Sequence, residues 1–295
     1  MRQFVGYACL DIDHPPVAWA TYRGVLVSAK AGIGPDMQPV SMMLAGIIRA
    51  QNNARLHNEL IIEYVRASSF PYAVSRLGGM YFFETMDGAL QATEWGSHFK
   101  PANIVELGIA PIRDVTRVDS NWITFARLED GGRLDIANLD WIQQYWRGLP
   151  FPDKTPLWEI LVEGRATIWG TDHRERAYEL LRNEFPDCLD TLEIARIGAE
   201  LESDLGHSRP WIRQISEDKY ELGYLLDMRD ATNPDFLKRL QEYKGPRNWK
   251  DLQIGVKETM GVPDFRPYGA TFHVGRLGHP ILPLAFPTLH VQNEG

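Results

Sequence analysis

Acidic and basic side chains lie in two short blocks of the sequence, at spacings that can support chemistry. The first block carries Glu59 and Glu63 on an expected helix, followed by Arg66 and then by Arg76 just before an apolar strand. The second block places Glu159 within an apolar run. A carboxylate held away from water can stabilise a developing positive charge or accept a proton. An arginine can hold a phosphate through paired hydrogen bonds.

Each of these residues also has a structural interpretation, which the sequence leaves open. Ile160 and Val162 point to the opposite side of the expected strand from Glu159, so a solvent-facing glutamate is the alternative to a catalytic one. Arg76 follows a loop, and the alternative for it is an ion pair with either glutamate of the preceding helix.

Aromatic side chains and one further arginine complete the candidate set. Tyr81 and Trp146 can stack on a planar ligand, and the alternative for both, as for Trp122, is packing in the core. Arg23, in Tyr22-Arg23-Gly24, is either a phosphate ligand or a surface arginine.

The two blocks resemble one family. Residues 59–84, ELIIEYVRASSFPYAVSRLGGMYFFE, resemble bacterial and phage domains of formerly unknown function that group with ADP-ribosyltransferases. These domains share a helix with Glu and Arg, then a Pro, then Ser-Arg before a strand that ends in an aromatic residue. Residues 145–168, YWRGLPFPDKTPLWEILVEGRATI, are similar to the segment in which DarT-like DNA ADP-ribosyltransferases carry the catalytic glutamate, in a Glu-apolar-Leu strand.

The resemblance implies that NAD is the substrate and that no metal takes part. It implies Glu159 as the catalytic residue and a set of NAD-binding residues, Arg23, Ser75, Arg76, Tyr81 and Trp146. The chain departs from the family in two respects. Arg23 stands where a His-Tyr-Glu pattern requires histidine, and no Ser-Thr-Ser triplet is present.

The expected fold class is α+β, with a division near residue 186. Residues 1–186 are expected to form an ADP-ribosyltransferase-like split mixed sheet with flanking helices, and residues 187–295 a smaller α+β part that recognises the target. The implied partner is a macromolecular acceptor, a protein or a nucleic acid, in a setting such as phage–host conflict. A local positive cluster in the second part is either the contact with that acceptor or a solvated face. Its members are Arg229, Lys238, Arg239, Lys244, Arg247 and Lys250.

Apolar periodicity and breakers predict the individual elements. Strands are expected over 3–12, 17–27, 80–84, 104–109, 122–127, 158–168 and 220–228. Helices are expected over 40–67, from the Thr85 cap to Trp95, over 139–146, from an Asp172–Glu175 capping box to Phe185, over 189–203, and after Asn233 and Asn248. Irregular strands are expected over 271–291.

Composition excludes several classes of protein. The net charge of -8 gives no overall electrostatic attraction for nucleic acid. Two cysteines and eight scattered histidines provide no local zinc motif and no disulfide framework. The sequence shows no signal-peptide core and no apolar run of the roughly 20 residues that a membrane span needs, so a cytoplasmic location is expected.

Two other functions remain open. The chain can be a non-catalytic module that binds a nucleotide or a protein on the same fold. It can also be a metal-dependent nucleic-acid enzyme that uses Asp119, Asp135 and Glu159, provided that the fold brings these carboxylates together.

Overall fold

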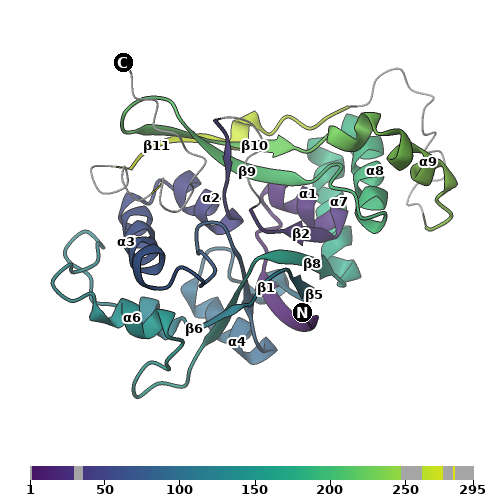
Figure 1. Cartoon of the computed structure of the whole chain (residues 1–295). Coiled ribbons are helices and arrows are strands. Elements are labelled where there is room, and N and C mark those ends of the chain that lie inside the picture. Colours follow the sequence, from purple (N-terminus) through teal and green to yellow (C-terminus); the bar gives the residue numbers. More distant parts are fainter. Residues whose placement is uncertain (1, 30–35, 247–260, 275–281, 283–295) are drawn as a thin grey trace.

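Two antiparallel β-sheets, with helices between and around them, make up the chain in a computed structural model that describes residues 2–29, 36–246, 261–274 and 282 (Figure 1). The expected α+β class is therefore confirmed. Every strand pair among the described residues is antiparallel, so the expectation of a mixed sheet was wrong.

The larger sheet has seven strands. In spatial order these are β2 (Val25–Val27), β8 (Gly164–Ile168), β5 (Ile104–Pro111), β1 (Phe4–Cys9), β4 (Met80–Phe83), β7 (Trp158–Val162) and β6 (Thr116–Asp119). Only Glu163 separates β7 from β8 in the sequence, although three strands, β5, β1 and β4, lie between them in this order.

The sheet therefore curls back on itself. One bent strand, β7 followed by β8, runs along β4 with its first half and along β5 with its second half, while β1 pairs with both β4 and β5. The bend needs glycine, because Gly164 has φ +154° and a Cβ atom there would lie 2.3 Å from the Ala110 carbonyl oxygen. Apolar side chains such as Phe82, Leu107 and Ile160 pack together as a core of this curled sheet.

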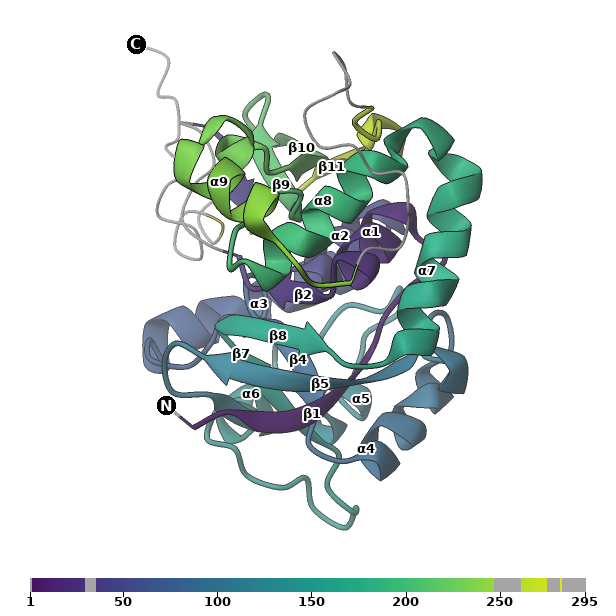
Figure 2. The same ribbon diagram turned by 90° about the vertical axis from the view of Figure 1, so that its right-hand side faces the viewer.

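The smaller sheet has the order β11 (Ala270–His273), β10 (Lys219–Leu226), β9 (Ser208–Gln214) and β3 (Gln38–Pro39). Helices α1 (Pro15–Arg23) and α2 (Met42–Arg49) lie between the two sheets (Figures 1 and 2). Side chains of α2 share one core with Ile212 and Phe272 of the smaller sheet. One hydrophobic core thus contains residues from before and after residue 186. The expected division of the chain into residues 1–186 and 187–295 stays a prediction.

The remaining helices pack around the sheets and around α1. They are α3 (Asn53–Ser69), α4 (Met86–Gln91), α5 (Asn121–Thr124), α6 (Asp140–Trp146), α7 (Thr171–Glu184), α8 (Leu189–Glu200) and α9 (Pro234–Glu242). Of these, α7 and α8 pack against α1, and α9 packs against α8. Short 3-10 turns span Ala92–Trp95, Pro101–Asn103, Pro186–Cys188, Arg229–Thr232 and Arg266–Tyr268. Within the described residues, no helix has the length and apolar character needed to cross a membrane.

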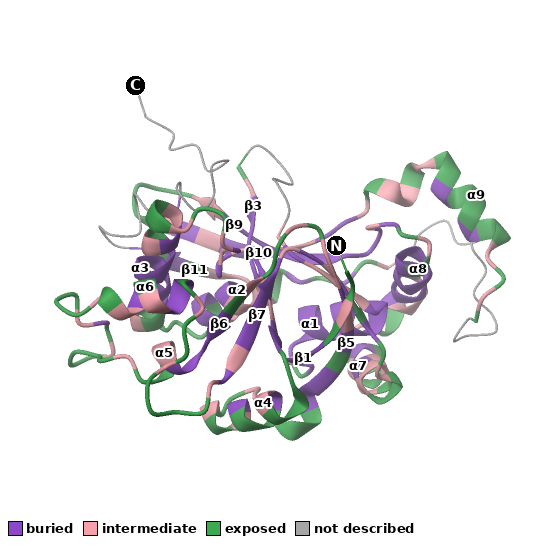
Figure 3. Cartoon of the chain, turned by 60° about the horizontal axis from the view of Figure 1, so that its bottom comes forward, coloured by how far each residue is buried: buried purple, intermediate pink, exposed green. Residues whose placement is uncertain are grey.

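The strand expected over residues 17–27 was wrong, because α1 occupies most of this segment. Pro15 and Pro16, which look like a break in the sequence, stand at the first helical positions, where proline needs no amide partner. Gly24 ends the helix with φ +88°. Every residue of α1 is buried (Figure 3), so the segment has no polar face from which a helical period could be recognised.

Two other local expectations were wrong. The segment around Trp122 forms α5 instead of a strand, beside a turn in which the Asp119 carboxylate accepts a hydrogen bond from the Asn121 amide. Helix α7 starts at Thr171, and no side chain caps it, so the expected Asp172 capping box does not form.

Most other elements are confirmed within a few residues, including the Thr85 and Asn233 caps. The helix expected after Asn248 and most of the strands expected over 271–291 lie outside the described residues.

Candidate functional site

Glu159 lies on the face of β7 that α3 and α6 cover. It pairs with Phe83 of β4 and with Val118 of β6. Ile160 and Val162 point into the core of the curled sheet, whereas Leu161 packs with α3 and α6. Only 7% of Glu159 is exposed, so the solvent-facing interpretation of this residue was wrong.

Arg76 is the centre of the polar contacts on this face. Its Nε and Nη2 donate to the two carboxylate oxygens of Glu59 at 2.8 and 3.0 Å, and its Nη1 donates to the Tyr145 hydroxyl at 2.7 Å. The same Nη1 lies 3.6 Å from Glu159 Oε2. The alternative that Arg76 forms an ion pair with a helix glutamate is therefore confirmed, with Glu59 as the partner.

Two tyrosines enclose the Arg76 guanidinium. Its Cζ lies 5.0 Å from the centre of the Tyr81 ring and 5.7 Å from that of Tyr145. The Tyr81 hydroxyl donates to the main-chain carbonyl of Arg76. Glu59, Arg76, Tyr81, Tyr145 and Glu159 are called the Arg76 cluster below.

The two glutamates of α3 have opposite electrostatic environments. Burial raises the pKa of Glu59, but attraction and hydrogen bonds from Arg76 outweigh burial and leave this pKa below its ordinary value. One turn further along, burial raises the pKa of Glu63 above its ordinary value, against the opposing effects of Arg66 and the Ser75 hydroxyl. The Arg76 cluster thus keeps Glu59 ionised inside the protein.

The pKa values of both tyrosines are raised. Burial is the main cause, the Arg76 charge opposes it, and the Glu59 and Glu159 charges add to it. A proton therefore stays on each phenol near neutral pH, and the cluster contains two carboxylates, two phenols and one guanidinium in a largely dry space.

A hollow of about 460 Å³ reaches the Arg76 cluster at Glu59. Its walls come from the first turns of α3 and from the hairpin between Leu128 and Leu134. Asn58 fixes this hairpin on α3, since its amide nitrogen donates to the Gly132 carbonyl at 2.9 Å and its amide oxygen accepts from the Leu134 amide at 2.8 Å. The hollow is of a size that suits a small ligand.

Ser75 and Trp146 lie close to the Arg76 cluster but serve the local structure. The Ser75 hydroxyl accepts from the Leu77 amide at 3.1 Å in the turn before β4. The Trp146 indole donates to the Ile62 carbonyl at 3.1 Å, and its ring packs in the core beneath α3 and α6. The packing alternative is confirmed for Trp146, of which 4% is exposed.

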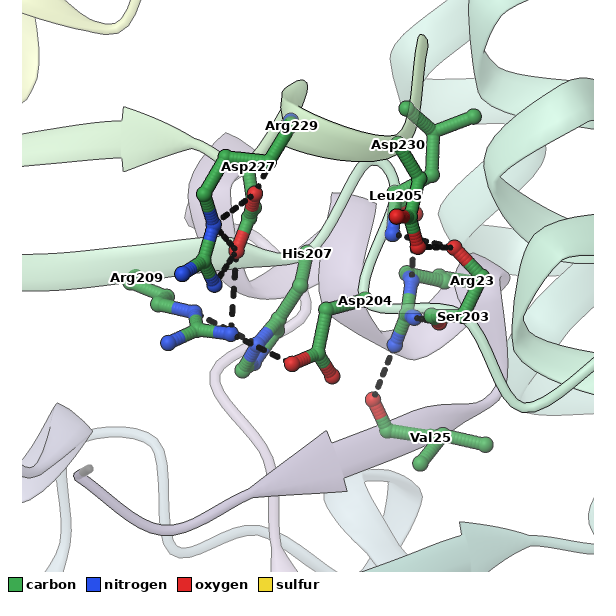
Figure 4. Close-up of polar contacts among 10 residues, drawn as sticks. All are labelled: Arg23, Val25, Ser203, Asp204, Leu205, His207, Arg209, Asp227, Arg229 and Asp230. Atoms are coloured by element: carbon green, nitrogen blue, oxygen red, sulfur yellow. Dashed lines mark hydrogen bonds and ion pairs between the residues drawn. The ribbon is translucent and has the colours of Figure 1, made fainter. Parts of the chain in front are cut away.

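The structure does not bring Arg23 to this site, because its guanidinium is hydrogen-bonded to the turn before β9, as Figure 4 shows. Its guanidinium is buried and donates to the main-chain carbonyls of Ser203, Leu205 and Val25. The expectation of a surface arginine was wrong, because Arg23 ties α1 to the turn before β9. Burial lowers the pKa of Arg23 to about 10.

The carboxylates considered for a metal site have other partners. Asp119 accepts from the main-chain amides of Asn121, Phe151 and Leu157. Asp135 accepts from the Ala137 amide and lies 3.8 Å from the Arg127 guanidinium. Among the described residues, no group of three or more His, Cys, Asp or Glu side chains is arranged to hold a metal ion.

The sequence did not single out Glu59 as a partner with a role of its own, or Tyr145 as a polar contact. A signal was present for both. Glu59 directly precedes the apolar run Leu60-Ile61-Ile62, and Tyr145 lies on the face of α6 that also carries Ile142. A polar residue on the apolar face of a helix needs a buried partner.

Comparison with known proteins gives one match. Residues 36–176 are similar to a family described as "Protein of unknown function (DUF2441)". No curated protein matches the chain. The matched segment contains every residue of the Arg76 cluster and ends before α8, and it leaves out Arg23.

Proposed function

We propose that the protein transfers ADP-ribose from NAD to a macromolecular acceptor and that Glu159 is its catalytic residue. One observation carries this proposal. The Glu159 carboxylate is almost fully buried, yet within the described chain it accepts no hydrogen bond, and its one ion pair, with Arg76, is as long as 3.6 Å. Buried carboxylates are normally paired and hydrogen-bonded, so this one keeps its oxygens available for a substrate.

The chemistry of NAD cleavage makes use of such a carboxylate. Breaking the bond to nicotinamide leaves positive oxocarbenium character on the ribose, and a nearby carboxylate stabilises that charge and can accept a hydrogen bond from the ribose 2′-hydroxyl. The effect is larger where water is excluded. The curled sheet, with this glutamate on a strand facing two helices, supports an ADP-ribosyltransferase-like fold as part of the same proposal.

The contacts of the other predicted residues decide which role each of them has in the proposal. Tyr81 is half-buried, and its ring packs against the core and faces the Arg76 guanidinium, so the proposal does not rest on stacking by this residue. Arg76 already donates to Glu59 and Tyr145, so it is a neighbour of Glu159 and not the donor to the NAD phosphates. The proposal does not use Arg23, whose hydrogen bonds lie elsewhere.

The test is Glu159→Gln, which keeps the size of the side chain and removes its charge. NAD cleavage and transfer to protein or nucleic acid in cell extract should fall about 100- to 1000-fold, as is common when one charge-stabilising group is lost from a dry site. The matched control is Glu163→Gln, four residues further on, where the carboxylate pairs with Arg113 and is partly exposed. Activity of Glu159→Gln within a few-fold of wild type excludes the assignment.

Two arms of the same assay address the alternatives. Loss of activity in a chelator, restored by one divalent ion, favours a metal-dependent nucleic-acid enzyme. NAD-dependent thermal stabilisation without nicotinamide release favours a non-catalytic binding module. The low exposure of Glu159 is also compatible with this alternative.

Recognition of the acceptor is assigned to the part of the chain after residue 186. Lys238 and Arg239 are exposed on α9, and Lys244 is exposed just beyond it, while Arg247 and Lys250 lie outside the described residues. Reversing the charge at Lys238, Arg239 and Lys244 together should reduce acceptor modification and leave NAD hydrolysis unchanged. An equal loss of both rates means that the two parts act as one catalytic unit.

A further inference from the structure

Arg76 contacts the two carboxylates of its cluster in different ways. It forms a two-pronged ion pair with Glu59, whereas its Nη1 stays 3.6 Å from Glu159, beyond hydrogen-bonding distance. We propose that Glu59 is a positioning residue that holds Arg76 back from Glu159, so that the Glu159 carboxylate remains available to the substrate. This inference rests on the proposed function of Glu159.

The backbone of Arg76 is held in place by hydrogen bonds, whereas the orientation of its guanidinium depends on the side chains around it. Its main-chain carbonyl accepts hydrogen bonds from the Ser41 hydroxyl, at 3.2 Å, and from the Tyr81 hydroxyl. The backbone is therefore fixed beside β4. Glu59 and Tyr145 then determine where the five N–H groups of the guanidinium point.

Competition between two buried anions for one cation explains why Glu59 matters. A fork-like pair between arginine and a carboxylate is stronger than a single long contact, and Glu59 takes this pair. Without the Glu59 charge, the buried Arg76 would have Glu159 as the remaining anion within reach. In a medium of low dielectric constant that attraction is large, and Arg76 would turn and neutralise Glu159.

Glu59 can act in this way because of its place on α3. The helix begins at the Asn52 cap, whose side-chain oxygen accepts from the Arg55 amide at 3.0 Å. This fixes the first turns, and Glu59, on the second, is 2% exposed beneath the hollow. The helix thus presents one carboxylate to Arg76, and the β7 strand carries the other, Glu159.

Glu63 provides a matched control. It lies one turn further along the same helix, is also fully buried, and also pairs with an arginine, accepting from Arg66 Nε at 2.8 Å. Arg66 donates in addition to the carbonyls of Pro71 and Ala73, so this pair holds a loop and has no ion pair with Arg76 or Glu159. A change at Glu63 perturbs a buried ion pair without releasing Arg76.

The experiment compares Glu59→Gln, Glu63→Gln and the double variant Glu59→Gln/Arg76→Gln, each first shown to be folded by circular dichroism. Turnover of NAD should fall about 100-fold in Glu59→Gln, as when a reacting group is misplaced by an ångström, and stay within a few-fold of wild type in Glu63→Gln. The double variant should be more active than Glu59→Gln, because no arginine remains to neutralise Glu159. A double variant that is less active than Glu59→Gln overturns the inference, since a purely structural role gives this result.

A crystal structure of Glu59→Gln separates this inference from the proposed function. The Arg76–Glu159 contact should shorten from 3.6 Å to a hydrogen bond. If it shortens while wild-type protein does not cleave NAD, the positioning by Glu59 stands and the proposed reaction fails. If it stays at its present length, the positioning fails, whatever the activity of the wild type.

Discussion

The Arg76 cluster and a second buried arginine cluster in α8 have nearly the same composition but use their carboxylates differently. In the second, the Arg196 cluster, Arg196 Nε and Nη2 donate to both oxygens of Glu193 at 2.9 and 2.8 Å. The Tyr22 hydroxyl donates to Glu193 at 2.9 Å, and Arg196 Nη1 also pairs with Glu200. Both clusters thus contain a forked Arg–Glu pair, a tyrosine hydroxyl and a second glutamate.

The two clusters differ in the exposure and the bonding of the second glutamate. In the Arg196 cluster, the Glu200 side chain is 42% exposed and bonds directly to Arg196 and to the Tyr243 hydroxyl. In the Arg76 cluster, the Glu159 side chain is 9% exposed and bonds directly to nothing in the described chain. The Arg196 cluster, whose polar groups are paired or in water, joins α1 to α8. Burial of the Glu159 carboxylate costs free energy that one long contact with Arg76, at 3.6 Å, offsets only in part, and it is this feature that points to function.

The largest effect expected from this comparison is on stability. Arg196→Met removes the forked arginine partner of the buried Glu193, and loss of one partner of a buried pair lowers the free energy of unfolding by about 3–5 kcal/mol. Chemical denaturation measures this change. If the proposed function holds, the folded fraction of Arg196→Met should cleave NAD at the wild-type rate, because no contact among the described residues joins the Arg196 cluster to Glu159.

Arg76→Met is the counterpart of this variant. It should destabilise to a similar extent, since Glu59 loses its forked partner, but it should also change the turnover of NAD by the folded protein. Equal effects of the two variants on turnover contradict the division of the clusters into a structural and a functional one.

The resemblance of two sequence blocks predicted Glu159 and Arg76 as residues of one site, and the structure places their side chains 3.6 Å apart; their roles in that site stay a prediction. The sequence offered an ion pair of Arg76 with Glu59 or Glu63 as an alternative, but it could not choose between the two glutamates, since the Glu59–Arg76 pair spans a helix, a loop and a turn. Seventeen positions separate the two residues, and only the packing of α3 on the sheet brings them together.

Two elements that the sequence did not reveal, α1 and β3, give no local signal. A period of apolar residues can be recognised only when the segment also has a solvent-exposed face with polar residues. Helix α1 has none, because Trp19 and its neighbours are buried between the sheets. Likewise, β3 consists of Gln38 and Pro39, and its pairing with β9 depends on a partner more than 170 residues away in the chain. No local pattern contains such information.

The smallest expected effects come from the two tyrosine hydroxyls, and they give the sharpest contrast between the clusters. Tyr22→Phe and Tyr145→Phe each remove one buried hydrogen bond and should each lower the free energy of unfolding by about 1 kcal/mol. Glu193 still has its forked bonds to Arg196 in Tyr22→Phe, so NAD turnover should not change.

In Tyr145→Phe, Arg76 Nη1 loses its acceptor at 2.7 Å and has Glu159, at 3.6 Å, as the nearest carboxylate. The guanidinium should turn towards Glu159, and turnover should fall by more than the fall in stability explains. Adding Arg76→Gln to Tyr145→Phe should restore part of this loss, as it should for Glu59→Gln. If both phenylalanine variants have wild-type turnover, Tyr145 has the same structural role as Tyr22, and Glu59 alone holds the guanidinium away from Glu159.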